Sequence, residues 1–306
     1  MRVTVAGGSG LIGRRVVAKL RESGHEVHVL GRGQVPMPGN IAWDPSEGII
    51  PEADLARADA VVNLTGAPIA AGRWTARRRA EIRSSRLDAT HAIVQAWRSV
   101  PPRPRVLVNA SATGYYGDCG ESWVDETQEP GRGFLAEVCT EWEAEAWRAA
   151  ELGARVVGLR FGVVLAAEGG ALARMLPAFR RGLGGPMGGG RQWMSWVSLA
   201  DAAGAVVLAL ADSEIRGAVN VVAPGVVRQL DFARILGGVL GRPAGMPIPA
   251  LLLRTIYGEM ARETLLASVR CRPSRLLEAG FRFCGPDLEG ALRQELAPSS
   301  SRGARA

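Results

Sequence analysis

Short apolar runs alternate along the chain with longer segments in which apolar residues recur at helical spacing. The strand-like runs cover residues 3–6, 26–30, 59–66, 105–110, 155–159 and 218–222. The helical patterns cover residues 11–23, 75–98, 134–151 and 201–211. Parallel strands need long crossover connections, and helices usually supply them. The alternation therefore predicts an α/β fold with a doubly wound parallel sheet.

The last third of the chain breaks this alternation. Glycines crowd residues 182–190 and predict a loop, and three prolines mark a boundary within residues 243–249. Beyond that boundary the pattern over residues 250–295 is mostly helical. We expect three parts: a large domain that includes the loop segment 182–196, a small helical lobe and a disordered tail. Their expected bounds are residues 1–245, 246–296 and 297–306.

Composition supports an ordinary globular protein. The chain has 306 residues, of which 47% are hydrophobic and 22% charged, and this usage excludes a disordered chain. No apolar run reaches the roughly 18 residues that a membrane span needs. The sequence opens directly on a strand-like run, without the basic and apolar regions of a secretory signal. We therefore expect a cytoplasmic protein with no membrane partner.

The basic charge weighs less than its size suggests. The net charge is +7, but Lys19 is the single lysine among 37 basic residues, and the arginines are dispersed. The densest run, Arg77–Arg79, falls in a helical pattern and is typical of a solvated face, so we expect no nucleic-acid partner. Four scattered cysteines and three histidines give neither a metal-ligand spacing nor a disulfide framework. We expect no metal.

The strongest local motif is the run Gly7-Gly-Ser-Gly-Leu-Ile-Gly13, which follows a strand and opens a helix. In that context the first glycine permits the tight turn, the second lets the backbone approach a pyrophosphate, and the third lets the helix pack against the sheet. The unpaired N–H groups of the helix N-terminus then face the phosphates. The alternative is a glycine-rich turn without a ligand. The candidate dinucleotide-binding residues are Gly7, Gly8, Ser9, Gly10, Leu11, Ile12 and Gly13.

The end of the second strand discriminates between cofactors. NAD sites usually place a carboxylate there to bind the ribose 2′-hydroxyl. This chain has Gly31-Arg32-Gly33 instead. An arginine pairs well with a 2′-phosphate, so Arg32 favours NADP(H) over NAD. The alternative is an exposed arginine in an arginine-rich chain.

Several longer stretches carry a family resemblance. Besides the glycine motif they are Asn63–Gly66, Ser111–Gly117, Trp43–Pro45, Arg73–Thr75, Phe134–Cys139, Trp142–Glu143, Gly184–Pro186, Gly190–Trp196 and Gly280–Phe283. The chain resembles the extended and atypical short-chain dehydrogenase/reductases, and within them the group called epimerase family proteins (family 39U). Its bacterial members are described as sugar-nucleotide epimerases. The resemblance implies an NADP-binding Rossmann domain with a small C-terminal domain, and cofactor contacts at Leu64, Thr65 and Gly66.

The usual catalytic pair of that superfamily is missing. Its members generally use Tyr-x-x-x-Lys with a serine or threonine, in which the lysine lowers the pKa of the tyrosine. By analogy the helix that should carry the pair has Cys139 and Glu143 at this spacing. The remaining hydroxyl groups follow the strand at residues 105–110, and strand ends are where ligands bind. The catalytic candidates are Ser111, for polarising a carbonyl, and Tyr116 or Tyr115, for donating a proton.

A structural role for these tyrosines is an equal alternative: one packs, and the other hydrogen-bonds to the backbone. Cys139 reads as a small buried hydrophobe, and Glu143 is a candidate acid or base only if it is buried.

The glycine-rich loop is the candidate substrate loop. Arg191 and Gln192 offer polar groups and Trp193 offers a stacking surface, which suits a nucleotide-linked or aromatic small molecule. The alternative is a loop braced by core tryptophans, Trp196 above all. Two functions remain open. The first is an NADP-dependent oxidoreductase or epimerase-like enzyme of the short-chain dehydrogenase/reductase superfamily, with an unknown substrate and a homodimer as the expected assembly. The second is a non-catalytic NADP(H)-binding regulatory or redox-sensing protein.

Overall fold

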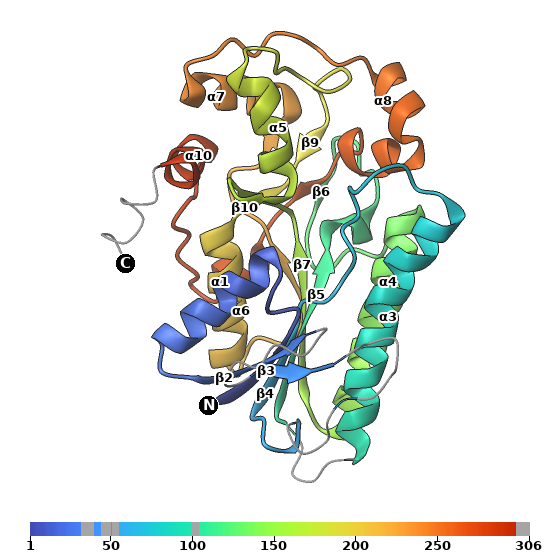
Figure 1. Ribbon diagram of the computed structural model, residues 1–306, viewed down its shortest axis with the longest axis vertical. Coiled ribbons are helices and arrows are strands. Elements are labelled where there is room, and N and C mark those ends of the chain that lie inside the picture. Colours follow the sequence, from blue (N-terminus) through green and yellow to red (C-terminus); the bar gives the residue numbers. More distant parts are fainter. Residues whose placement is uncertain (32–39, 44–49, 51–54, 100–103, 298–306) are drawn as a thin grey trace.

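A sheet of seven parallel strands forms one end of the computed structural model (Figure 1). Residues 1–31, 40–43, 50, 55–99 and 104–297 are described. Arg32 and the expected tail beyond residue 297 lie outside them. The strand order is β11-β7-β5-β4-β1-β2-β3, and every neighbouring pair is parallel. The strands are β1 (Arg2–Ala6), β2 (Glu26–Gly31), β3 (Asn40–Ala42), β4 (Ala60–Asn63), β5 (Val106–Ala112), β7 (Arg155–Phe161) and β11 (Gly217–Val221).

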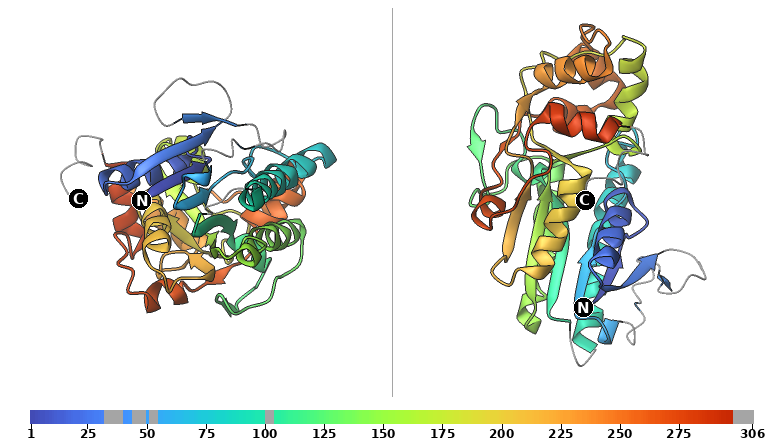
Figure 2. Two further views of the ribbon diagram at one scale, coloured as in Figure 1. Left: turned by 90° about the horizontal axis from the view of Figure 1, so that it is seen from below. Right: turned by 90° about the vertical axis from the view of Figure 1, so that its left-hand side faces the viewer.

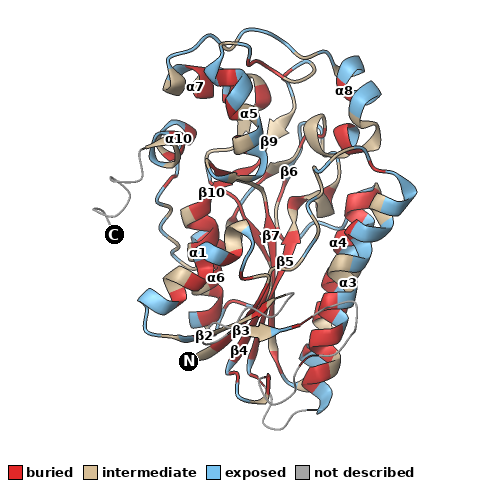
Figure 3. Cartoon of the chain, in the orientation of Figure 1, coloured by how far each residue is buried: buried red, intermediate tan, exposed pale blue. Residues whose placement is uncertain are grey.

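Helices cover both faces of this sheet, as Figures 1 and 2 show. Helices α1 (Leu11–Glu22) and α6 (Leu199–Ala211) pack together on one face, and α3 (Ala76–Ser99) and α4 (Phe134–Trp147) pack together on the other. The inner strands are therefore buried on both sides, which explains why they read as continuous apolar runs (Figure 3). The prediction of a doubly wound parallel sheet is confirmed. The chain order reverses between β1 and β4, and α/β folds bind ligands at such a point.

A second lobe stands at the end where the strands of the sheet finish (Figure 1). Its short strands pair in twos: β6 (Trp123–Val124) with β13 (Arg270–Cys271), β8 (Val163–Ala166) with β10 (Trp196–Ser198), and β9 (Trp193–Met194) with β12 (Val227–Arg228). Its helices are η2 (Thr113–Tyr116), α5 (Gly170–Arg180), α7 (Gln229–Leu240), α8 (Ala250–Tyr257), η4 (Ala261–Leu265) and α10 (Leu288–Leu296). Helix α9 (Ser274–Glu278) packs on β11, and η3 (Ala150–Leu152) follows α4.

One apolar core joins distant parts of the chain in this lobe. Leu172 of α5, Phe232 of α7 and Leu292 of α10 are fully buried in the same cluster. Helix α10 therefore packs with segments that precede residue 245, and the division at 245/246 stays a prediction. The sequence pattern missed β3, α5 and α7. Strand β3 has three residues, and the Pro177 inside α5 hides a helix that tertiary packing stabilises.

The second lobe is tied to the sheet domain through the start of α4. The Glu263 carboxylate accepts hydrogen bonds from the backbone N–H groups of Phe134, at 3.0 Å, and Leu135, at 2.9 Å. These N–H groups begin a helix and have no partner within it, so a carboxylate there satisfies both and also faces the positive end of the helix dipole. Glu263 belongs to η4, one turn of π-helix. Among the described residues, no helix is long and apolar enough to cross a membrane.

Candidate functional site

The glycine motif forms a close-packed turn between β1 and α1. The N–H of Gly10 donates to the carbonyl of Gly7 at 3.0 Å, and Gly7 has a φ of +78°, which side-chain-bearing residues rarely adopt. A Cβ at Gly7 would lie 2.7 Å from the carbonyl of Leu64, and one at Gly13 would lie 2.1 Å from the Gly7 oxygen. Only glycine fits at these two positions, because any side chain would displace backbone.

The N-terminus of α1 is left open by this turn. Gly10 is its N-cap, no side chain caps it, and its first turn contains no acidic residue. The first N–H groups of α1 are therefore free to donate to an external anion, and the positive end of the helix dipole would attract it. The turn fits the pyrophosphate of a dinucleotide, because its glycines expose the backbone directly beside the uncapped N-terminus of α1. Gly8 packs against Val29 of β2, and Ser9 is exposed with its carbonyl bound by Arg14.

A buried asparagine fixes the neighbouring strand end. Asn63 ends β4, and its side-chain oxygen accepts from both the N–H and the hydroxyl of Thr65, at 3.2 and 2.6 Å. Its amide nitrogen donates to Asn109 of β5, at 2.7 Å, and to Thr90 of α3, at 2.9 Å. The segment from Leu64 to Gly66 is thereby held against the glycine turn. The preference of Arg32 for a 2′-phosphate falls outside the described residues and stays a prediction.

Beyond the end of β5 lies a buried network of polar side chains. Arg160 of β7 pairs with Glu143 of α4 through two hydrogen bonds of 2.8 Å, and each residue is at most 4% exposed. The hydroxyl of Ser111 donates to Glu143 at 2.6 Å. The remaining nitrogen of Arg160 donates to the hydroxyl of Tyr116 at 2.9 Å, and that hydroxyl donates to Asn220 at 2.7 Å. The network links the strands β5, β7 and β11 with the helices α4 and η2.

The side chains of this network use their hydrogen-bonding groups on one another. The proton of Ser111 goes to a carboxylate, and both hydrogen-bonding directions of the Tyr116 hydroxyl are used. Burial raises the pKa of Tyr116, so its hydroxyl keeps its proton. Burial opposes the charge of Arg160, but the hydrogen bonds and charge of Glu143 outweigh that effect and raise its pKa. The pair is therefore an ion pair inside the protein, which needs its full set of hydrogen bonds to be tolerated.

Tyr115 differs from its neighbour. It is only partly buried, and its ring packs edge to face with that of Tyr116 at a centroid distance of 5.3 Å. The guanidinium carbon of Arg160 lies 3.4 Å from the Tyr115 ring centroid, a cation–π contact. Burial raises the pKa of Tyr115 as well, against the opposing charge of Arg160. Of the three predicted catalytic residues, Tyr115 is the one that is not fully buried.

The two residues at the expected catalytic-pair spacing do different work. Glu143 is bound in the ion pair with Arg160, and Cys139 is 3% exposed. Burial raises the pKa of the Cys139 thiol to about 11, with the Glu143 charge adding to the effect, while Arg86, Ala112 and Ser111 act in the opposite direction. The thiol is therefore protonated at neutral pH. A role as a small buried hydrophobe agrees with this burial.

Most of the chain matches known protein families. The chain matches the NAD dependent epimerase/dehydratase family over residues 3–222 and a domain of unknown function, DUF1731, over residues 248–295. A Mycobacterium bovis epimerase family protein is 40% identical over 281 residues, 92% of this chain and 93% of the relative. The chain belongs to the NAD dependent epimerase/dehydratase family. Within that family it groups with the SDR39U1 proteins, since bovine SDR39U1 is 38% identical over 301 residues, 97% of this chain and 100% of the relative.

Two solved structures are similar to this protein over almost its whole length. The crystal structure of human epimerase family protein SDR39U1 with NADPH matches with a TM-score of 0.88 and 34% identity, over 96% of this chain and 98% of that chain. A Thermus thermophilus UDP-glucose 4-epimerase in complex with NAD matches with a TM-score of 0.74 and 21% identity, over 96% and 97% of the two chains. At that identity the second match shows the fold alone.

Two of the predicted substrate-loop groups brace the loop of this family member. The side-chain nitrogen of Gln192 donates to the carbonyls of Met187, at 3.0 Å, and Leu265, at 2.9 Å. The ring nitrogen of Trp193 donates to Glu121 at 3.0 Å. Arg191 is exposed. The Gln192 amide thus ties the loop to the turn that also carries Glu263.

The ring of Trp193 is part of a stack of side chains. The guanidinium carbons of Arg228 and Arg270 lie 4.3 and 4.0 Å from its centroid. Arg270 also contacts Trp123, which in turn contacts Arg272. Trp193 therefore has arginine neighbours within the protein, and these contacts hold β9, β12 and β13 together at the surface of the lobe.

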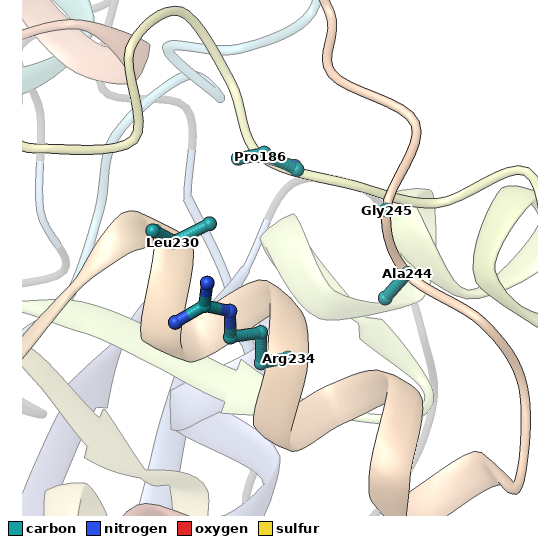
Figure 4. Close-up of a pocket in the computed structure, with 5 residues that line it drawn as sticks. All are labelled: Pro186, Leu230, Arg234, Ala244 and Gly245. Carbon is teal, nitrogen blue, oxygen red and sulfur yellow. The ribbon is translucent and has the colours of Figure 1, made fainter.

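Sequence reasoning missed the importance of Arg160. The signal was present, because a charged residue inside the apolar run of β7 needs a buried counter-charge. A pocket of about 380 Å³ also went unpredicted. It lies in the second lobe, lined by Pro186, Leu230, Arg234, Ala244 and Gly245, and Figure 4 shows the Arg234 side chain reaching into it. Among the described residues, no group of three or more potential ligands is arranged to hold a metal.

Proposed function

We propose that this family member binds NADP(H) and works as an oxidoreductase or epimerase-like enzyme on a small molecule at the ends of β4 and β5. The observation that carries the proposal is the open N-terminus of α1 above a turn that only glycine fits. The NADPH in the human SDR39U1 structure supports the choice of cofactor. When bound, this cofactor supplies or accepts a hydride.

The residues proposed to hold the cofactor come from the sequence motif, and the contacts around the glycine turn support all of them but Arg32. The backbone of Gly7, Gly8, Ser9, Gly10, Leu11, Ile12 and Gly13 would bind the pyrophosphate. Leu64, Thr65 and Gly66 would line the adjacent wall, since Asn63 fixes this segment beside the turn. Arg32 would bind the 2′-phosphate.

We place proton transfer at Tyr115 rather than Tyr116. A proton donor must reach the substrate, and the Tyr116 hydroxyl is buried between Arg160 and Asn220. Tyr115 is partly exposed and lies over the same arginine. Ser111 would then be a positioning residue, because its proton is held by Glu143. The role that sequence assigned to Ser111, polarising a carbonyl, requires that this hydrogen bond be exchanged for one to the substrate.

The first experiment replaces the N-cap of α1. Gly10 has a φ of −72°, which any residue adopts, and aspartate is a preferred N-cap. A Cβ at this position would lie 3.2 Å from the Gly7 carbonyl oxygen, so Gly10→Asp and Gly10→Asn should lower the thermal midpoint of unfolding by a similar small amount. Gly10→Asp should also repel the pyrophosphate and lower NADPH affinity by about 100-fold or more in calorimetry. Gly10→Asn is the matched neutral control and should lose less. Unchanged NADPH affinity in Gly10→Asp would remove the main support for the site.

A second function has its own observation. Cys139 and Glu143 stand where the family's proton-transfer pair is expected, and the Glu143 carboxylate is closed within an ion pair. A protein of this kind binds NADP(H) and senses it without turning it over. Tight NADPH binding, together with no NADPH oxidation across a panel of aldehydes, ketones and nucleotide sugars, would favour it.

The remaining expectations concern the setting of the reaction. A nucleotide-linked or aromatic substrate, a homodimer and a cytoplasmic location stay predictions.

A further inference from the structure

Arg86 occupies a distinctive place beside the proposed cofactor wall. It projects from α3 toward the end of β4, where its Nη1 donates to the carbonyls of Ala67, at 3.2 Å, and Ile82, at 2.9 Å. On its other side, the guanidinium carbon lies 5.2 Å from the ring centroid of Trp142. Both hydrogen bonds use Nη1. The other edge of the guanidinium, formed by Nε and Nη2, makes no hydrogen bond within the described part of the chain.

The backbone of Gly66 packs over the planar face of this guanidinium. A Cβ at Gly66 would lie 3.1 Å from Cζ, 3.2 Å from Nη2 and 3.4 Å from Nε of Arg86. Because Cζ is the nearest of the three atoms, this position lies over the face and does not cover the in-plane edge of Nε and Nη2. Gly66 belongs to the segment that borders the glycine turn. The carbonyl of Leu64, two residues earlier, lies against Gly7. The free edge of Arg86 and the proposed cofactor site thus share one short piece of backbone.

Arg160 has a carboxylate partner in Glu143, but Arg86 has none among the described residues. Within residues 1–31, 40–43, 50, 55–99 and 104–297, no carboxylate forms an ion pair with it. Burial lowers the pKa of Arg86, a sign that its charge is held at a cost. Nearby Glu143 is already taken by Arg160 and Ser111. A partly buried arginine with a free fork and no counter-ion is suited to a planar anion from outside.

We propose that Arg86 binds a carboxylate of the substrate, so that the site takes a small carboxylic acid. This inference rests on the proposed function, because it places the carboxylate next to the cofactor wall. Cys139 lies close enough to Arg86 for the arginine charge to lower the pKa of the thiol, against the larger effect of burial. Glu143 balances the charge of Arg160, whereas Arg86 has no carboxylate partner among the described residues and keeps its charge for an anion.

The test uses oxalate, a planar dianion, and its neutral isostere oxamide. Each is titrated by calorimetry into the protein saturated with NADP⁺, so the readout is binding and not turnover. Oxalate should bind saturably and oxamide should not. Arg86→Gln should weaken oxalate binding by about 10- to 100-fold, the value of hydrogen bonds to a charged group, and Arg86→Lys by less. Arg83→Gln, an exposed arginine on the same helix, is the matched control and should leave the affinity unchanged.

The outcomes separate this inference from the proposed function. If NADP⁺ fails to bind the wild type, the proposed function fails. If NADP⁺ binds and oxalate does not, or oxamide binds equally well, the carboxylate site is overturned. The same holds if Arg86→Gln keeps its oxalate affinity, or loses NADP⁺ affinity while keeping that for oxalate. Should Arg86→Gln not fold, the oxalate–oxamide contrast in the wild type and the Arg86→Lys affinity decide the question.

Discussion

The two edges of the candidate site are built in opposite ways. The edge at β1 is bare backbone: glycines, an uncapped helix and a strand end held from behind by Asn63. The edge at β5 and β7 is filled by an ion pair and the hydroxyl groups that surround it. The first keeps its hydrogen-bonding groups for a ligand, whereas the second satisfies them internally. This contrast teaches that an open glycine turn and a polar network with internally satisfied hydrogen bonds coexist in one sheet.

The largest effect that would break this contrast is expected at Glu143. Glu143→Ala leaves the Arg160 charge buried without a partner and should lower the free energy of unfolding by about 3–5 kcal/mol, measured by urea denaturation. Glu141→Ala is the matched control on the same helix, since Glu141 forms an exposed pair with Arg83 and should cost about 1 kcal/mol or less. Similar losses in the two variants would mean that the network is not a structural unit.

A middle-sized effect separates the two tyrosines. Tyr116→Phe removes a hydroxyl that accepts from Arg160 and donates to Asn220, and should cost about 1–3 kcal/mol of stability. Tyr115→Phe should change the free energy of unfolding by less, because Tyr115 is partly exposed and keeps its ring contact with Arg160. If the enzyme proposal holds, Tyr115→Phe is the variant that loses turnover. The reverse pattern in both measurements would return proton donation to Tyr116.

The smallest effect concerns Glu121 at the surface of the lobe. Hydrogen bonds from Arg228 and Trp193 lower the pKa of Glu121 to about 2. A carboxylate with a lowered pKa in the folded state contributes stability that is present above its unfolded pKa, near 4.5, and is lost as the pH falls toward 2. The difference in stability between wild type and Glu121→Gln should therefore shrink from pH 6 to pH 3. A constant difference over that range would contradict the assignment.

The cofactor edge was predictable because its causes are local. The spacing of Gly7, Gly10 and Gly13 between a strand and a helix contains both the turn and the open helix end. The catalytic edge depends on contacts that sequence does not reveal. Arg160 reaches Glu143 only because β7 lies beside β5 and α4 packs across them. Sequence therefore placed Ser111 and the tyrosines at a strand end but could not show that their hydrogen bonds are taken.

The same limit applied to the loop. Gln192 has a side chain that could contact a substrate. Its amide nitrogen instead donates to two backbone carbonyls, one of them in η4. Whether a polar side chain faces a ligand or a neighbouring backbone is decided by the packing of the second lobe. That lobe is built from segments before and after residue 245, so no local pattern specifies it.

The carboxylate of Glu263 has a consequence for how the chain can be divided. It completes the first turn of α4 from a segment about 130 residues further along the chain. Helix α4 carries both Cys139 and Glu143, so the start of the helix that shapes the catalytic edge is finished only when the C-terminal part has been made and docked. A shortened chain ending at residue 245 would have the whole sheet and every glycine of the cradle, yet would leave that helix end bare. The C-terminal part of the chain thus supplies the cap for a helix of the sheet domain.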